Sequence, residues 1–160
     1  MKSIASYSLQ LTLVLILMAI STVAQSSPIL SLESPTGQQI NLSREDLESL
    51  PQTTFTTSTP WTKGIHTYQG PRLNLITDKL KPSINGIRIY AVNGYSYDIN
   101  IHDLKKYPFI LALRQDEKAL SLRNKGPFWL LVPFDQNPHW LSLDKLRNQL
   151  VWQINKIKAL

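Results

Sequence analysis

The sequence predicts an α+β domain with a mixed or mostly antiparallel sheet and short helices. Six or more short stretches of alternating apolar residues are separated by turn residues, and brief helical patterns interrupt them without a regular strand-helix alternation. The 160-residue chain also contains no cysteine. Because no disulfide can form, a domain of this size must be held together by its apolar core alone.

The first 24 residues have the three parts of a cleavable export signal. Lys2 is followed by an apolar run over residues 11–20 and then by small residues that end at Ala24. A run of ten residues is too short to span a bilayer, although an uncleaved anchor remains the alternative. We therefore expect residues 1–24 to be a signal peptide, residues 25–160 to form one domain, and the protein to be periplasmic.

The charge of the chain is basic and dispersed. Lysine and arginine number 17 against 11 acidic residues, which gives a formal net charge of +6. The dispersed charge, the export signal and the lack of a recognisable binding module argue against a nucleic acid partner. An anionic small ligand or an anionic membrane surface is the expected kind of partner.

The first elements are read from alternation, capping and turn residues. Residues 29–32 alternate as a strand, residues 35–37 form a turn, and a second extended run follows. Ser43 and Asp46 have the spacing of a capping box, which predicts a short helix that ends before Pro51.

A threonine-rich segment comes next. Residues 52–61 read as an extended strand because threonine is β-branched. Residues 68–71, Tyr-Gln-Gly-Pro, predict a turn, and residues 73–80 predict a short helix that ends near Lys81 and Pro82.

The middle of the chain predicts two hairpins. Residues 87–91 and 95–101 alternate on either side of an Asn-Gly turn, and residues 103–107 form a helical turn. In the second hairpin, four leucines alternate on either side of a polar turn at residues 115–118. These are Leu111, Leu113, Leu120 and Leu122.

The C-terminal third contains an interior strand and a final strand. Residues 128–132 are apolar on both faces, as expected of an interior strand. Residues 135–140 read as a loop, residues 142–150 as weakly helical, and residues 151–157 as the last strand.

A basic loop precedes the interior strand. Residues 123–127 place two cations, a side-chain amide and a glycine within five positions, which suits an anion or the polar edge of a ring. A solvated basic turn is the structural alternative.

The sequence offers no catalytic constellation. His66, His102 and His139 stand 36 and 37 positions apart, so they lack the short-range spacing of common zinc sites. No nucleophile elbow is present. A catalytic residue or a metal ligand is therefore not expected.

Binding chemistry is better supplied. Trp61 ends the threonine-rich strand, Asn93 and Tyr97 flank a turn, and Arg123 and Lys125 lie in the basic loop. Aromatic faces and hydrogen-bond donors without a strong nucleophile suit a flat polar heterocycle. The other tryptophans are expected in the core, namely Trp129, Trp140 and Trp152.

Four motifs, taken in order, resemble a known family. They read DLESLPQTTFTTSTPW, TYQGPRLNLI, AVNGYSYDINIHDLKKYPFILALRQDEKALSLRNKGPFWLLVPFD and LVWQINKI. The chain from about Leu42 to Ile157 is similar to the oxidoreductase molybdopterin-binding domain, which has the sulfite oxidase fold, in a small exported form. The resemblance implies that the pterin pocket is lined by Thr57, Thr59, Trp61, Asn93, Tyr97, Arg114, Arg123, Asn124, Lys125, Gly126 and Pro127.

The chain departs from the catalytic members of that family in its metal ligand. Those members hold molybdenum through a cysteine thiolate, and this chain has none. A preassembled cofactor also needs a twin-arginine signal, whereas the first arginine here is Arg44. We therefore expect a pterin ligand without molybdenum.

The resemblance implies a periplasmic, non-catalytic pterin-binding protein. Small cysteine-less proteins of this kind are associated with membrane sensors that carry diguanylate cyclase or phosphodiesterase domains, which make or degrade cyclic di-GMP. The alternative is a molybdopterin-dependent oxidoreductase, or a subunit of one, that holds its cofactor without the thiolate. A third possibility is a scaffold with an empty pocket.

Overall fold

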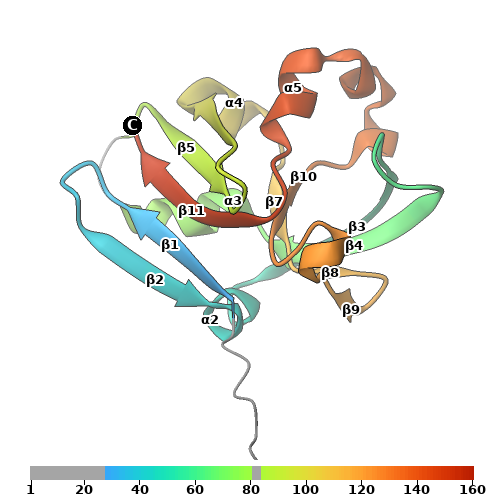
Figure 1. Cartoon of the computed structure of the whole chain (residues 1–160). Helices are drawn as coiled ribbons and strands as arrows, with labels where there is room; N and C mark the ends of the chain where they lie inside the picture. The colour runs from blue at the N-terminus through green and yellow to red at the C-terminus, as the bar shows by residue number, and fades with distance from the viewer. Residues whose placement is uncertain (1–27, 81–83) are drawn as a thin grey trace, which may run out of the picture.

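The computed structural model describes residues 28–80 and 84–160. The expected signal peptide and the expected helix end at Lys81 and Pro82 lie outside these residues. The described chain forms an α+β fold with three sheets and short helices, as the sequence predicts (Figure 1).

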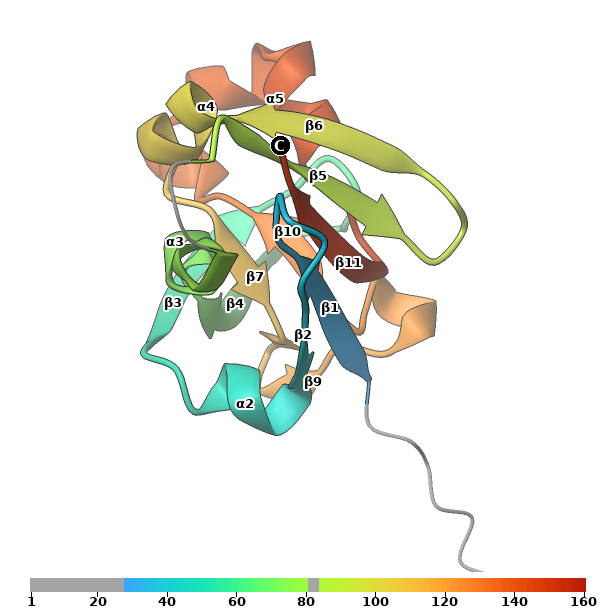
Figure 2. The same cartoon turned by 90° about the vertical axis from the view of Figure 1, so that its left-hand side faces the viewer.

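The larger sheet has five strands and a mixed topology. Its strands in spatial order are β2 (Gln39–Ser43), β1 (Ile29–Glu33), β11 (Ile154–Ala159), β5 (Gly86–Ala91) and β6 (Ser96–Asn100). β1 pairs with β11 in parallel, and every other pairing in this sheet is antiparallel. The C-terminal strand therefore lies at the centre of the sheet, between the first strand and the central hairpin (Figure 2).

Two smaller sheets lie beside the larger one. The four-stranded sheet consists of β3 (Gln52–Ser58), β4 (Ile65–Pro71), β8 (Arg114–Gln115) and β9 (Lys118–Ala119), and the two-stranded sheet of β7 (Ile110–Ala112) and β10 (Trp129–Leu131). Every residue of β7 and β10 is buried, which confirms the predicted interior strand.

The helices are short and join the strands. The α-helices are α2 (Arg44–Glu48), α3 (Leu73–Thr77), α4 (Ile101–Lys106) and α5 (Asp144–Gln149), and the 3-10 turns are η1 (Asp78–Leu80), η2 (Leu122–Asn124), η3 (Phe134–Gln136) and η4 (Pro138–Ser142). The predicted capping box is present at α2, where the amide of Asp46 donates to the Ser43 hydroxyl and the Ser43 amide donates to the Asp46 carboxylate. None of the helices in the described ranges has the length and apolar character needed to cross a membrane.

Two apolar clusters form the core. The larger one joins the five-stranded sheet to α2, α3 and the inner strands, and it contains fully buried residues such as Leu30, Ile89 and Ile157. Burying a side chain of this size contributes about 1.5–3 kcal/mol. The smaller cluster lies around Tyr68 and Trp129. The smaller cluster continues into the candidate site described below.

The prediction of a turn at residues 68–71 is wrong. These residues form the end of β4, which pairs along its whole length with β3. Gly70 is present for packing, because a Cβ atom there would lie 1.9 Å from the carbonyl oxygen of Leu111. The glycine lets the backbones of β4 and β7 approach closely.

The second predicted hairpin is shorter than expected. Asp116 and Glu117 both have positive φ and form the turn between β8 and β9, which pair over two residues each. Leu111, Leu113 and Leu120 are buried as expected, but Leu122 is 58% exposed. Leu122 lies in η2, because the chain leaves the sheet after Ala119.

Other predicted boundaries also shift. The threonine-rich strand ends at Ser58, Ile101 begins α4 instead of ending a strand, and the last strand begins at Ile154. Gln153 has a φ of 56°, which interrupts the extended backbone just before β11.

Candidate functional site

Three tryptophans from distant parts of the chain converge. The ring centroid of Trp61 lies 6.1 Å from that of Trp129 and 5.7 Å from that of Trp152, in both cases edge to face. Trp129 is fully buried, as expected, and its indole NH donates to the carbonyl of Leu150 at 3.3 Å. Trp61 and Trp152 are only partly buried, so they offer aromatic surface to a ligand.

These two rings line a small pocket, here called the aromatic pocket. It has a volume of about 240 Å³. Its lining consists of Trp61, Ala91, Asn93, Tyr95, Arg147, Asn148, Leu150, Val151 and Trp152. Aliphatic and aromatic walls with a few amide and guanidinium groups are typical of a site for a flat polar ring.

The β5–β6 turn supplies the polar rim of the aromatic pocket. The side-chain oxygen of Asn93 accepts a hydrogen bond from the Tyr95 amide at 3.1 Å, which leaves the Asn93 amide NH2 as a donor. The Tyr95 hydroxyl donates to the carbonyl of Asn148 at 3.4 Å. The turn and α5 are thus joined across the pocket.

A buried carboxylate fixes α5, which carries the opposite wall. Asp103 accepts hydrogen bonds from Gln149 and from Lys145, each at 2.7 Å. Burial opposes ionisation of Asp103, but these two partners outweigh it and lower the pKa of the carboxyl group. The anchored helix places Arg147 and Asn148 at the pocket.

A second cavity, here called the basic pocket, contains the basic loop. Its volume is about 430 Å³. It is lined by Thr62, Lys63, His66, Gln115, Asp116, Lys118, Ala119, Leu120, Arg123, Asn124 and Lys125. Four lysine and arginine side chains face one carboxylate, so the pocket favours an anionic group.

Lys125 connects the two pockets. Its backbone is left-handed, with a φ of 63°. Its ammonium group lies 5.5 Å from the ring centroid of Trp129 and 5.7 Å from that of Trp152. A cation at this distance is attracted to the ring faces. Lys125 therefore lines the basic pocket and contacts Trp152, which lines the aromatic pocket.

The one carboxylate of the basic pocket is already paired. Asp116 accepts from the backbone amide of Thr67 at 3.0 Å and lies 2.7 Å from Nδ1 of His66. The hydrogen bond to Asp116 raises the pKa of His66, and the bonds from Thr67 and His66 lower the pKa of Asp116. Nε2 of His66 lies 2.8 Å from the carbonyl of Lys63, so the protonated ring can donate on both sides.

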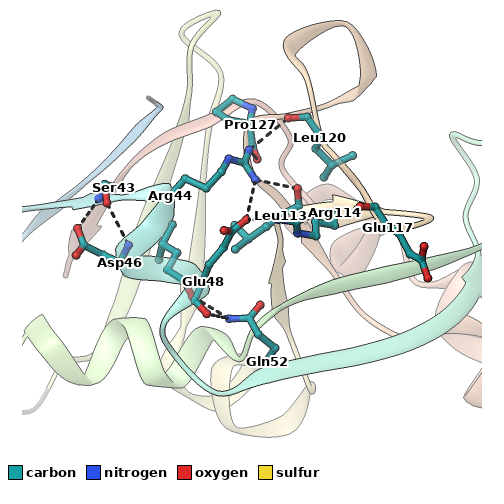
Figure 3. A network of polar contacts seen from close by, with 11 residues as sticks. Ser43, Arg44, Asp46, Glu48, Gln52, Leu113, Arg114, Glu117, Leu120 and Pro127 are labelled. Carbon is teal, nitrogen blue, oxygen red and sulfur yellow. Dashed lines mark hydrogen bonds and ion pairs between the residues drawn. The ribbon is translucent and has the colours of Figure 1, made fainter. Parts of the chain in front are cut away.

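Arg44 holds the basic loop in place from α2 (Figure 3). Its guanidinium donates to the carbonyl oxygens of Leu113 at 3.1 Å, Leu120 at 3.4 Å and Pro127 at 3.1 Å. It also lies 3.9 Å from the carboxylate of Glu48. One partly buried cation thereby joins Leu120, which precedes the loop, and Pro127, at its end, to α2.

The eleven residues expected to line one pocket do not lie together in the structure. Trp61 and Asn93 line the aromatic pocket, and Arg123, Asn124 and Lys125 line the basic pocket. The remaining six line neither of these two cavities, namely Thr57, Thr59, Tyr97, Arg114, Gly126 and Pro127.

Several of those six have clear structural roles. The Thr57 hydroxyl accepts from the amide of Asp135 at 3.1 Å. Arg114 donates to the carboxylate of Glu48 at 3.1 Å. Gly126 is needed for packing, because a Cβ atom there would lie 2.4 Å from the carbonyl oxygen of Leu120. These residues shape the loops around the pockets.

Sequence reasoning missed four polar or aromatic residues of the aromatic pocket. These are Tyr95, Arg147, Asn148 and Trp152. Trp152 was expected in the core, but it is partly exposed and its ring lies beside that of Trp61. The sequence contains one signal for these residues. Arg147 and Asn148 are adjacent in the weakly helical segment that precedes Trp152.

Comparison with known proteins gives a match in three-dimensional structure but none in sequence. No protein-family model matches the chain, and no curated protein is similar to it at the level of sequence. The crystal structure of the sulfane dehydrogenase SoxCD from Paracoccus pantotrophus is similar, with a TM-score of 0.61 and 16% sequence identity. The match covers 82% of this chain and 38% of that one, and it supports a sulfite oxidase-like fold.

Proposed function

We propose that this protein binds a pterin without catalysing a reaction on it. The observation that carries the proposal is the aromatic pocket, in which Trp61 and Trp152 present partly exposed rings beside the amide of Asn93. Its volume of about 240 Å³ is below the roughly 300–1,000 Å³ of sites for drug-sized ligands, so it suits a compact bicyclic ring.

The donor set of the pocket fits a pterin and does not fit its metal. A pterin stacks on aromatic faces and is recognised along its polar edge, and the amides of Asn93 and Asn148 with the guanidinium of Arg147 suit that edge. Molybdenum would need a soft protein ligand, and the chain has no cysteine. The described residues also include no group of three or more histidine and acidic side chains that could hold a metal ion.

The second part of the proposal is a signalling role in the periplasm. Bound pterin would bias the periplasmic domain of a membrane sensor that makes or degrades cyclic di-GMP. Support for this partner comes from the motif resemblance. A ligand shifts such an equilibrium only as far as it prefers one state over the other.

Titration calorimetry with tetrahydropterins tests the binding function. We expect a saturable heat with one site per chain, and mass spectrometry of protein isolated from the periplasm should identify a co-purifying pterin. A flat titration at millimolar ligand would contradict the proposal and leave the protein as a scaffold.

A second candidate is a molybdopterin-dependent oxidoreductase, or a subunit of one. The likeness in fold to a dehydrogenase favours it. The chain spans 38% of that enzyme chain, so a catalytic assembly would need further protein. Metal analysis separates the two candidates, because stoichiometric molybdenum in the purified protein would favour the oxidoreductase.

A further inference from the structure

Three exposed apolar side chains from three separate segments meet at one groove, here called the apolar groove. Ile29 in β1 is 54% exposed, Val92 after β5 is 50% exposed, and Leu122 in η2 is 58% exposed. All three line a concave surface of about 810 Å³, and the buried residues Leu120 and Ile154 also contribute to it. Exposed branched side chains gathered in a groove mark an interaction site more often than scattered ones.

The charged residues of the apolar groove have one sign. Among the described residues that line it, the only charged ones are Arg44 and Arg123. Arg44 is engaged by three carbonyl groups and by Glu48. The side chain of Arg123 makes no hydrogen bond or ion pair with another described residue. A complementary occupant therefore combines apolar side chains with a carboxylate.

We propose that the apolar groove docks an extended segment of a partner protein that carries branched apolar residues next to an aspartate or glutamate. The apolar side chains lie against Ile29, Val92 and Leu122, and the carboxylate pairs with Arg123.

Other occupants fit the charge and the shape less well. Residues 1–27 of this chain contain no aspartate or glutamate to pair with Arg123. A second copy related by a two-fold axis would place its own arginines against these. A lipid bilayer is broad and flat, whereas this surface is concave.

The groove is continuous with both pockets. The β5–β6 turn presents Val92 to the groove and Asn93 and Tyr95 to the aromatic pocket. Arg123 lines both the groove and the basic pocket. If the proposed function holds, a ligand that fixes the turn also fixes one wall of the groove, so docking depends on the ligand.

Site-specific photo-crosslinking tests the docking. The variant Leu122→p-benzoylphenylalanine, made in cells that naturally produce the protein, should form one main adduct on irradiation. The cross-linked peptide, sequenced by mass spectrometry, should come from another protein and contain an acidic residue beside branched apolar ones. Ile65→p-benzoylphenylalanine is the matched control, because Ile65 is 67% exposed but lies on β4, away from the groove.

Charge reversal tests the assigned contact. Arg123→Glu should lower the yield of the Leu122 adduct at least about fivefold, whereas Lys105→Glu, the same change in charge on the exposed side of α4, should leave it unchanged. A homodimer, an adduct to residues 1–27, a lipid adduct, no adduct, or equal effects of the two reversals would each overturn the proposal.

The docking and the pterin proposal fail in different ways. Leu122→Ser should abolish the contact and leave pterin affinity unchanged, since Leu122 lines neither pocket. Absence of an adduct from the Leu122→p-benzoylphenylalanine protein, together with a normal pterin titration, would reject the docking alone. A flat pterin titration with an intact Leu122 adduct would reject the ligand and leave the docking surface in place.

Discussion

Trp61 differs from its two neighbours because it follows Pro60 just beyond the end of β3, where its ring is held by edge contacts rather than by burial. Replacing it should therefore remove ligand contact, with some loss of packing because Trp61 also lies against both apolar clusters. We expect Trp61→Ala to weaken pterin binding by about 1–3 kcal/mol in calorimetry. Trp61→Phe, which keeps an aromatic face, should lose much less binding free energy. Equal affinity in wild type and Trp61→Ala would remove Trp61 from the site.

His66 should make stability depend on pH. Its pKa is raised above 6.5 by Asp116, so the folded state binds a proton more tightly than the unfolded state. The stabilisation is complete below pH 6.5 and is lost as pH rises through the raised pKa of His66. On the acid side, the lowered pKa of Asp116 keeps its contribution present above pH 3.8, and this is lost as pH falls through the folded value.

The comparison with His66→Gln measures this effect. The difference in unfolding free energy between wild type and variant should be largest between about pH 4 and 6.5 and should shrink above that range. An NMR titration of the His66 ring should give a midpoint above 6.5. A midpoint at or below 6.5 would contradict the hydrogen bond to Asp116.

At the residue scale, the sequence predicted only those site residues that carry a local signal. Trp61 follows a threonine-rich strand and Asn93 lies in an Asn-Gly turn, and both line the aromatic pocket. Trp152 has no such signal, and the positive φ of the next residue, Gln153, is not marked in the sequence either. The separation of Arg123 and Lys125 from Trp61 into another pocket depends on tertiary contacts that no local pattern contains.

Among the elements, α2 has an effect beyond its five residues, because Arg44 supports the basic loop. Lysine keeps the charge but lacks the planar guanidinium that reaches three carbonyl groups. Arg44→Lys should lower the unfolding free energy by about 1–3 kcal/mol, measured by urea denaturation. Arg88→Lys, at an exposed pair with Asp98, is the control and should have little effect. Equal losses of unfolding free energy in Arg44→Lys and Arg88→Lys would show that the contacts of Arg44 with the carbonyl groups contribute little to stability.

The contact between β4 and β7 depends on Gly70. Gly70→Ala would force a methyl group against the backbone of Leu111, so we expect a loss of about 1–3 kcal/mol or failure to fold. Gly37→Ala is a useful comparison, because Gly37 has a φ of 84° but no atom within 4 Å of an added Cβ. It should cost about 1–2 kcal/mol through backbone strain alone. A Gly70→Ala protein of normal stability would contradict the close approach.

Element types were predicted better than element ends. The capping box of α2 and the Asn-Gly turn between β5 and β6 are local signals, and both are present in the structure. The pairing of β4 with β3 was missed, because Gly70 and Pro71 indicate a turn unless the neighbouring strand is known. The early end of the second hairpin follows from the left-handed turn at Asp116 and Glu117, which alternation alone does not reveal.

For the whole molecule, the tryptophan cluster and the larger sheet should unfold together. Trp152 forms an isolated β-bridge with Trp129. It is joined through Gln153 to β11, the central strand of the five-stranded sheet. Thermal unfolding followed by tryptophan fluorescence and by far-ultraviolet circular dichroism should therefore give the same midpoint. Two separated transitions would indicate that the pockets and the sheet are independent units.

The parallel pairing of Ser31 with Lys156 joins the first described strand to the last. The five-stranded sheet cannot close until β11 has been synthesised, so a nascent chain that lacks these residues has no centre on which β1 and β5 can assemble. Contacts between such distant residues also form slowly. The topology thus delays completion of the five-stranded sheet until the last strand has left the ribosome.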